Sequence, residues 1–140
     1  MTEVIIIVAV LVLATIAGIV MKSRSGRVHQ SVAHIAVQSI FSVLPEAQVD
    51  PTARVTAIQF SSAFCQPCRA TRVILDDVAQ MIDGFAHVDI DAESHLEQIR
   101  TLDIRKTPTV VFVDAGGMEF ARASGQPRKA DVIATVADHL

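Results

Sequence analysis

The chain has 140 residues, 51% of them apolar, and a formal net charge of −3 at pH 7. This length has room for one ordinary domain and little else. The acidic balance argues against a surface that binds nucleic acid, because the basic side chains form no cluster outside residues 22–27.

Residues 4–21 form an apolar stretch without a charged side chain, and Thr15 carries its only hydroxyl. A helix of this length spans roughly 27 Å, which is close to the thickness of a bilayer hydrocarbon core. The alternative is a cleaved signal peptide, but such a peptide carries basic residues before its apolar stretch, and Met1–Glu3 has none. We therefore expect a short tail over residues 1–3, followed by a transmembrane anchor over residues 4–21.

The flanking charges predict how this anchor is oriented. Lys22, Arg24 and Arg27 follow the apolar stretch, and no Lys or Arg precedes it. By the positive-inside tendency, the N-terminus lies outside and the bulk of the chain lies in the cytoplasm. A permanent structural disulfide would be unusual in that compartment, because the cytosol keeps thiols reduced.

A linker is expected over residues 22–53. The near-helical spacing of its apolar residues predicts a helix over residues 28–44, which Pro45 ends. Residues 45–54 contain two prolines and predict a loop.

Strands and helices alternate over residues 54–140, in the order β-α-β-α-β-β-α. The first strand is rich in apolar and β-branched residues, the second alternates between apolar and polar residues, and the helices show one apolar face. The predicted elements are a strand over 55–60, a helix with apolar residues from Ile74 to Ile82 that Gly84 stops, a strand over 87–91, a helix opened by a Ser94–Glu97 capping box and reaching about Leu102, a strand over 109–114, a strand over 118–123 after a Gly116–Gly117 turn, and a helix over 128–140.

Cys65 and Cys68 are the two cysteines of the chain, and they lie between the first of these strands and its helix. Two cysteines at this spacing are compatible with a structural disulfide, a metal site or a redox pair. A metal site is disfavoured, because the sequence has no second C-x-x-C and no paired histidine motif. At a helix N-terminus, unpaired N–H groups and the helix dipole stabilise a thiolate on the first cysteine.

Three features in this order resemble the thioredoxin family. They are the Cys65–Cys68 motif between a strand and a helix, Thr107–Pro108 where that family keeps a cis-proline facing the cysteines, and Gly125 after the fourth strand. The resemblance covers residues 54–140. It implies an α/β, thioredoxin-like domain, with a central mixed β-sheet flanked by helices, after a single N-terminal transmembrane helix. This plan resembles that of membrane-tethered thioredoxin-like proteins of bacteria.

The resemblance also implies roles for individual residues. Cys65 is the attacking thiol, and Cys68 is the resolving thiol that breaks the mixed disulfide. The Thr107 backbone pairs with an extended stretch of the substrate. The residues expected to bind the substrate are Phe64, Thr107, Pro108 and Gly125.

Two positions depart from the family pattern. Gln59 stands where the family has a buried acid, and His87 aligns with the basic residue that usually faces that acid. We expect both side chains near the sulfur of Cys68, where a neutral His87 would act as a proton relay. The alternative is a His87 that pairs with Gln59 or solvent and has no catalytic role. Ser61 and Phe64 take the positions of the usual aromatic residues before the motif.

The sequence therefore predicts a membrane-anchored thiol–disulfide oxidoreductase on the cytoplasmic face. Its partners are a protein disulfide or a membrane redox protein, and the bilayer through residues 4–21; no cofactor, metal or nucleic acid is expected. One alternative is an exported oxidase, isomerase or maturation factor. Another is a non-enzymatic module that docks a partner through the face around Pro108, although such a module has no need for Cys65 and Cys68.

Overall fold

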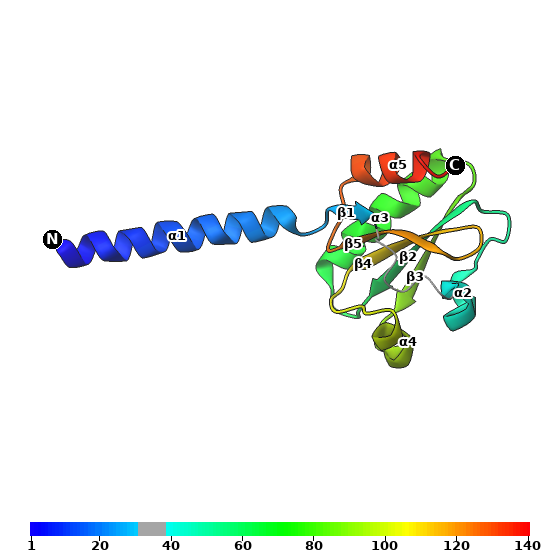
Figure 1. Cartoon of the computed structure of the whole chain (residues 1–140), viewed down its shortest axis with the longest axis horizontal. Helices are drawn as coiled ribbons and strands as arrows, with labels where there is room; N and C mark the ends of the chain where they lie inside the picture. The colour runs from blue at the N-terminus through cyan, green and yellow to red at the C-terminus, as the bar shows by residue number, and fades with distance from the viewer. Residues whose placement is uncertain (31–38) are drawn as a thin grey trace.

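The computed structural model describes residues 1–30 and 39–140. Its first element is α1 (Thr2–Arg24), a long helix that projects away from the other elements (Figure 1). The stretch Thr2–Ser23 is long and apolar enough to cross a membrane, and none of it is buried inside the protein. The helix predicted over residues 4–21 is therefore confirmed, and it is not a core helix.

The other elements form one five-stranded mixed sheet with helices on both faces (Figure 1). The strand order is β1–β5–β4–β2–β3, in which β2 and β3 are parallel and the other neighbours are antiparallel. The strands are β1 (Val28–Gln30), β2 (Val55–Ser61), β3 (Phe85–Asp91), β4 (Thr109–Asp114) and β5 (Glu119–Ser124). The helices after α1 are α2 (Ile40–Val43), the 3-10 helix η1 (Pro45–Ala47), α3 (Gln66–Met81), α4 (Leu96–Thr101) and α5 (Lys129–Ala137).

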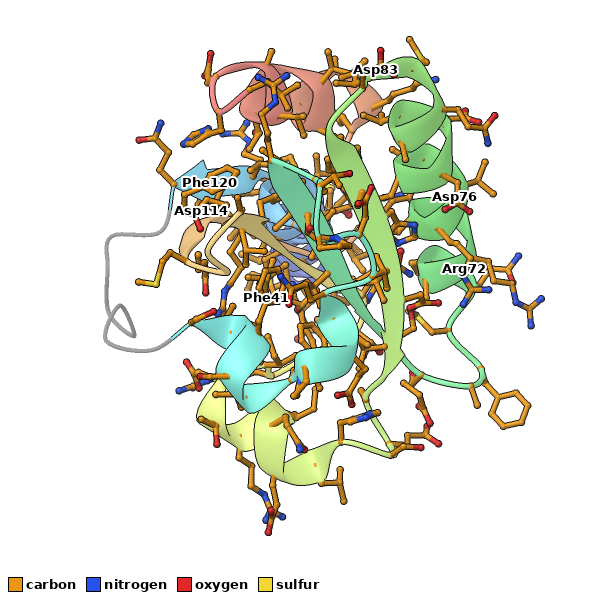
Figure 2. The ribbon with its side chains drawn as sticks, turned by 90° about the vertical axis from the view of Figure 1, so that its right-hand side faces the viewer. Phe41, Arg72, Asp76, Asp83, Asp114 and Phe120 are labelled. Atoms are coloured by element: carbon orange, nitrogen blue, oxygen red, sulfur yellow. A yellow bond between two sulfur atoms is a disulfide. The ribbon has the colours of Figure 1, made fainter. Side chains whose placement is uncertain are left out.

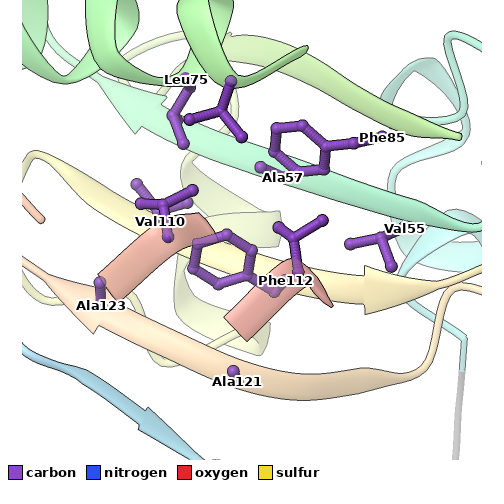
Figure 3. Close-up of a cluster of buried hydrophobic side chains, with 11 residues drawn as sticks. Val55, Ala57, Leu75, Phe85, Val110, Phe112, Ala121 and Ala123 are labelled. Carbon is purple, nitrogen blue, oxygen red and sulfur yellow. The ribbon is translucent and has the colours of Figure 1, made fainter. Parts of the chain in front are cut away.

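Helices α3 and α5 cover one face of the sheet, and their apolar side chains form a core with it (Figure 3). Leu75 of α3 and Val132 of α5 are fully buried there. They pack with Ala57 of β2 and Phe112 of β4. The apolar face predicted for each of these two helices is therefore confirmed.

A second core lies on the opposite face, under α2, η1 and α4. Ile58 and Phe60 point into it from β2, because successive side chains of a strand alternate between its faces. Leu44 and Leu102 close this core from the helical side. By the same alternation, Gln59 lies on the α3 side of β2, which is the side of the cysteines.

The helix predicted over residues 28–44 is wrong at its start. Val28–Gln30 is the edge strand β1, which pairs antiparallel with Ala121–Ala123 of β5. Pairing with a strand far along the chain overrides the local helical spacing there, because spacing reports only local preference. Residues 31–38 lie outside the described residues, and helix α2 covers only the end of the predicted range.

The capping box predicted at Ser94 is also wrong. Helix α4 begins later, its N-cap residue is His95, and no side chain caps it. The Ser94 hydroxyl donates instead to the carboxylate of Asp91, at the end of β3. Such local competition between acceptors is common for serine, because its short side chain reaches several nearby groups.

Candidate active site

The two cysteines lie where β2 ends and α3 begins. They form a disulfide, and their Cα atoms are 5.2 Å apart. Cys65 is the N-cap residue of α3, and its sulfur accepts a hydrogen bond from the backbone N–H of Cys68 at 3.2 Å. Pro67 lies in the first turn, where its missing N–H leaves no helical hydrogen bond unmade. The Cys65 sulfur therefore takes the place of the side-chain oxygen that caps many helices.

The two cysteines differ in their access to solvent. Cys65 is partly exposed, whereas Cys68 is only 2% exposed. A group approaching from outside therefore reaches the sulfur of Cys65 first. When the pair is reduced, the N–H groups and the dipole at the start of α3 stabilise a thiolate on this residue.

The loop before β4 and the turn after β5 lie at the same end of the sheet as the disulfide. The Thr107–Pro108 peptide bond is cis, as predicted. Thr107 Oγ1 lies 3.0 Å from the Oγ of Ser62, which belongs to the segment before Cys65. The backbone N–H of Gly125 donates to the carbonyl of Pro108 at 2.7 Å. These contacts join the predicted substrate-binding segments to one another.

Phe64 precedes Cys65 in the chain and extends into solvent. Its exposed fraction is 99%, so it contributes almost nothing to the packing of the chain. Aromatic side chains supply a large share of the energy of protein interfaces. An exposed ring next to the accessible cysteine is therefore a suitable contact for a docking partner.

Gln59 connects the middle of β2 to the first turn of α3. Its side chain is fully buried. Its Nε2 donates to the backbone carbonyl of Cys68 at 2.9 Å and to Ser61 Oγ at 2.8 Å. The carbonyl oxygen Oε1 of Gln59 has no hydrogen-bond partner among the described residues. Both N–H groups of the Gln59 amide thus donate to fixed acceptors, whereas its carbonyl oxygen accepts no hydrogen bond from the described residues.

The hydrogen-bond chain continues from Ser61 to the helix. Ser61 Oγ donates to Asp89 Oδ1 at 2.6 Å, and Asp89 Oδ2 accepts a hydrogen bond from Arg72 Nε of α3 at 2.8 Å. Figure 2 shows Arg72 and Asp76 extending from α3, one turn apart. This network binds the start of α3 to the ends of β2 and β3.

A cavity of about 400 Å³ opens beside the disulfide. Charged groups of both signs surround it. Its lining includes Cys65, Cys68, Ser61, Arg69, Arg72, Asp89, Asp91 and Glu93. The cavity therefore lies beside the cysteine pair, along the edge where β3 ends.

His87 does not lie where the sequence predicted it. The residue of β3 opposite Gln59 is Asp89, whereas His87 faces Ala57, two positions back along the strand. His87 Nδ1 lies 2.7 Å from Asp76 Oδ1, and Asp76 is two helical turns along α3 from Cys68. His87 therefore contacts Asp76 and not Gln59, the partner that the alternative interpretation gave it. Ser61 and Asp89 occupy the position that His87 was expected to fill.

At the end of β3 and just after it, two groups, Asp91 and His95, have shifted pKa values. The pKa of Asp91 lies below its ordinary value, mainly because the Ser94 hydroxyl and the Glu93 backbone N–H donate to its carboxylate. The pKa of His95 lies above its ordinary value of 6.5, mainly because its ring bonds to the Asp91 backbone carbonyl and also to Glu46. His95 thus joins the end of β3 to η1 through a pair whose Nε2–Oε1 distance is 2.7 Å.

Comparison with known proteins agrees with this arrangement. The thioredoxin family model matches residues 44–138 of the chain. Thioredoxin H4-1 of Oryza sativa is 29% identical over 70 residues, which cover 50% of this chain and 53% of that protein. Thioredoxin of Mycoplasmoides gallisepticum is 28% identical over 81 residues, which cover 58% of this chain and 81% of that protein. For the putative thioredoxin H10 of Arabidopsis thaliana the matched part is 41% of its length, so the chain spans about half of these plant relatives.

Solved structures show the same fold. Fasciola hepatica thioredoxin matches with a TM-score of 0.56 and 23% identity, over 64% of this chain and 85% of that one. A mutant thioredoxin from Halobacterium salinarum matches with a TM-score of 0.61 and 17% identity, over 67% of this chain and 81% of that one. Because the family model covers well over half of the sequence, this chain belongs to the thioredoxin family.

Proposed function

We propose that this chain is a membrane-anchored thiol–disulfide oxidoreductase, with Cys65 as the nucleophile and Cys68 as the resolving thiol. The observation that carries the proposal is the asymmetry of the pair. Cys65 caps α3 with a partly exposed sulfur, while Cys68 is buried within the first turn. A redox pair needs one sulfur that partners can reach and a second that only the first can reach.

The reaction follows from this asymmetry. The reduced Cys65 thiolate attacks a disulfide of the substrate and forms a mixed disulfide, and one substrate sulfur leaves as a thiolate. Cys68 then loses its proton and attacks the Cys65 sulfur, which releases the second substrate sulfur. The two leaving thiolates take up protons, and two electrons have moved to the substrate. The product is the Cys65–Cys68 disulfide, which a dithiol donor must reduce before the next cycle.

The neighbouring segments would hold the substrate. The backbone of Thr107, next to Pro108, would pair with an extended stretch of the partner, as in strand addition to a sheet edge. Phe64 would supply apolar contact area beside the attacked disulfide. Gly125 donates to the Pro108 carbonyl and so would fix the turn after β5 beside the segment that pairs with the partner.

Helix α1 would anchor the domain in a bilayer. The stretch Thr2–Ser23 has 22 residues, and at about 1.5 Å per residue these span roughly 33 Å, which matches a hydrocarbon core of about 30 Å. The cations Lys22, Arg24 and Arg27 follow it, so the positive-inside tendency supports a cytoplasmic domain and an N-terminus outside. A cytoplasmic location favours reduction of substrates over their oxidation.

The redox proposal is tested with the full chain in detergent, reduced by dithiothreitol and then mixed with insulin. We expect insulin reduction coupled to formation of the Cys65–Cys68 disulfide. Cys65→Ser abolishes the activity, whereas Cys68→Ser accumulates mixed disulfides that are visible on non-reducing gels. The assignment of roles is wrong if Cys68 is alkylated faster than Cys65 in the native reduced protein.

The anchor and its orientation need a separate experiment. An impermeant thiol reagent should label Cys65 of the Cys68→Ser variant in inverted membrane vesicles, but not in intact cells. Labelling in intact cells would show the opposite orientation, with the domain outside the cytoplasm. The mass of the membrane-bound protein distinguishes an anchor from a signal sequence, because cleavage would remove α1.

A further inference from the structure

Ser25 and Gly26, the residues that follow α1, lie directly against the turn after β5. The backbone N–H of Gly26 donates to the carbonyl of Ser124 at 2.8 Å. A Cβ atom placed on Gly125 would lie 2.5 Å from the Oγ of Ser25, and one on Gly26 would overlap the carbonyl of Gln126. This close approach is possible because both positions are glycines, and both have positive φ angles.

The same turn is part of the candidate active site. Gly125 donates to the Pro108 carbonyl, and Thr107 contacts Ser62 just before the first cysteine. Lys106 Nζ reaches back to Ser25 Oγ at 3.4 Å. A continuous series of contacts therefore runs from the first residue after α1 to the segment that carries Cys65.

The connection between α1 and the sheet is short and held at both ends. Helix α1 ends at Arg24 and β1 begins at Val28, so only residues 25–27 lie between them. Three residues reach at most about 10 Å. Strand β1 is in turn paired with Ala121–Ala123 of β5. The domain therefore has little freedom to turn on its tether.

Figure 1 shows the consequence for the whole chain. Helix α1 meets the domain at the end of the sheet where β5 finishes and α3 begins, and the β4–β5 turn lies at the other end. The exposed cations Lys22, Arg27 and Lys106 lie on or next to the segments that join at this end. Lysine and arginine close to a bilayer are attracted to anionic lipid headgroups.

We propose that the short connection after α1 turns the face of the domain that carries Cys65 toward the bilayer. The partner of the Cys65–Cys68 pair is then a cysteine pair of an integral membrane protein, exposed at the membrane surface. This rests on the proposed anchor and thiol exchange. With α1 in the bilayer, Ser25 lies at the level of the headgroups, and the active-site loops lie against Ser25. Membrane-surface sulfurs are then within reach, while the far side of the domain faces the aqueous phase.

The chemical step is the exchange already described, with the partner named by class. The Cys65–Cys68 dithiol becomes a disulfide, the surface disulfide of the membrane protein becomes a dithiol, and two electrons and two protons pass between them. The reverse direction has the same balance. In both directions, the membrane restricts the encounter to sulfurs near its surface.

Orientation is measured first, by a method that requires no redox activity. In Cys68→Ser, Cys65 is the one thiol and takes a donor dye, and vesicles contain an acceptor dye on a lipid headgroup. The matched protein is Cys65→Ser/Cys68→Ser/Ala115→Cys, labelled in the exposed β4–β5 turn, about 17 Å farther along β5. We expect clearly higher energy transfer from Cys65. Equal transfer, or higher transfer from position 115, would overturn the proposal.

The reaction is measured next, with the reduced full chain in vesicles. The surface probe is a phosphatidylethanolamine whose headgroup carries a pyridyl disulfide, and the soluble probe is the charged, impermeant dithiobis(nitrobenzoate). The matched variant has a Gly/Ser spacer of about twelve residues between Arg24 and Ser25, which frees the domain and keeps Ser25 on its loop. Because the spacer lowers the local concentration of the surface probe, we expect a several-fold slower reaction with it and an unchanged reaction with the soluble probe.

The outcomes separate this inference from the proposed function. If neither probe reacts with the original chain, thiol exchange itself fails. If the soluble probe reacts and the spacer leaves the surface reaction unchanged or makes it faster, the Cys65 face is directed away from the bilayer and the inference is wrong.

Discussion

Gln59 donates its side-chain amide to the backbone carbonyl of Cys68 at 2.9 Å, and so fixes the first turn of α3 to β2. The second hydrogen of this amide goes to Ser61 Oγ, and Ser61 in turn donates to Asp89. A glutamine can make these two donations at once, whereas an ionised acid has no hydrogen to donate. The residue that departs from the family pattern therefore has a structural task at the active site.

Gln59→Ala is expected to lower the free energy of unfolding by about 2–4 kcal/mol, because it leaves a cavity and two buried acceptors without their donor. Urea unfolding of the oxidised full chain in detergent measures this loss. The control is Gln80→Ala, on the exposed side of α3, which should change stability by less than about 0.5 kcal/mol. Equal losses in the two variants would contradict a structural role for Gln59.

His87→Ala is expected to leave both steps of thiol exchange at their original rates between about pH 6 and 8. The reason is position, because His87 contacts Asp76 and the group opposite Gln59 is Asp89. Stopped-flow measurement of formation and release of the mixed disulfide provides the test. If the variant slowed only the release of the mixed disulfide, the result would support the proton relay that the sequence suggested.

The same variant should lose stability, since the His87 side chain is 4% exposed and its removal leaves a gap beside α3. Asp76→Ala removes the partner of the ring but lies at a half-exposed position, so its loss should be smaller. The two variants together separate the packing of the ring from its ion pair.

His95 should make stability depend on pH. Its pKa is raised in the folded protein by the Asp91 carbonyl and by Glu46, so its contribution is complete below the unfolded value of 6.5 and is lost as the pH rises through the folded value. We expect His95→Gln to lower the melting temperature more at about pH 6 than at about pH 9. Thermal unfolding followed by circular dichroism measures this difference.

Glu46→Gln serves as the partner control for His95. The pKa of Glu46 lies below its ordinary 4.5, mainly through a backbone hydrogen bond, so this carboxylate stays charged throughout the range tested. The variant removes the charge that faces the His95 ring and should show a similar pH-dependent loss. A loss in His95→Gln that does not vary with pH would mean that the ring contributes only contacts.

The order of strands and helices after residue 54 could be predicted from the sequence, because each element carries a local signal. Strand β2 is rich in apolar and β-branched residues, and α3 shows an apolar face that ends before Gly84. Strand β1 could not be predicted in this way. Its three residues become a strand only through pairing with β5, which lies far along the chain.

The candidate site shows the same division. The cysteine motif and Thr107–Pro108 are local, and their order along the chain could be identified by its resemblance to the thioredoxin family. The Gln59–Ser61–Asp89 network depends on the register between β2 and β3, and a shift of two positions exchanges Asp89 for His87. The alternation of β3 places both residues on one face, so the sequence could indicate the face but not the register.

Phe64→Ala is expected to weaken reduction of a protein disulfide without changing the reaction with a small one. Phe64 is 99% exposed and contributes almost nothing to the packing of this chain, so removal of its ring should leave the melting temperature unchanged. A protein partner would cover the ring while its disulfide lies on Cys65, and loss of such an aromatic contact costs about 1–3 kcal/mol, or roughly 5- to 150-fold in kcat/KM.

Insulin and the small, soluble dithiobis(nitrobenzoate) are the two substrates that test this prediction. Met81→Ala is the control, since Met81 is also exposed but lies at the other end of α3, about 20 Å away. Equal losses with both substrates would mean that Phe64 affects the cysteine pair itself and not the docking of a partner.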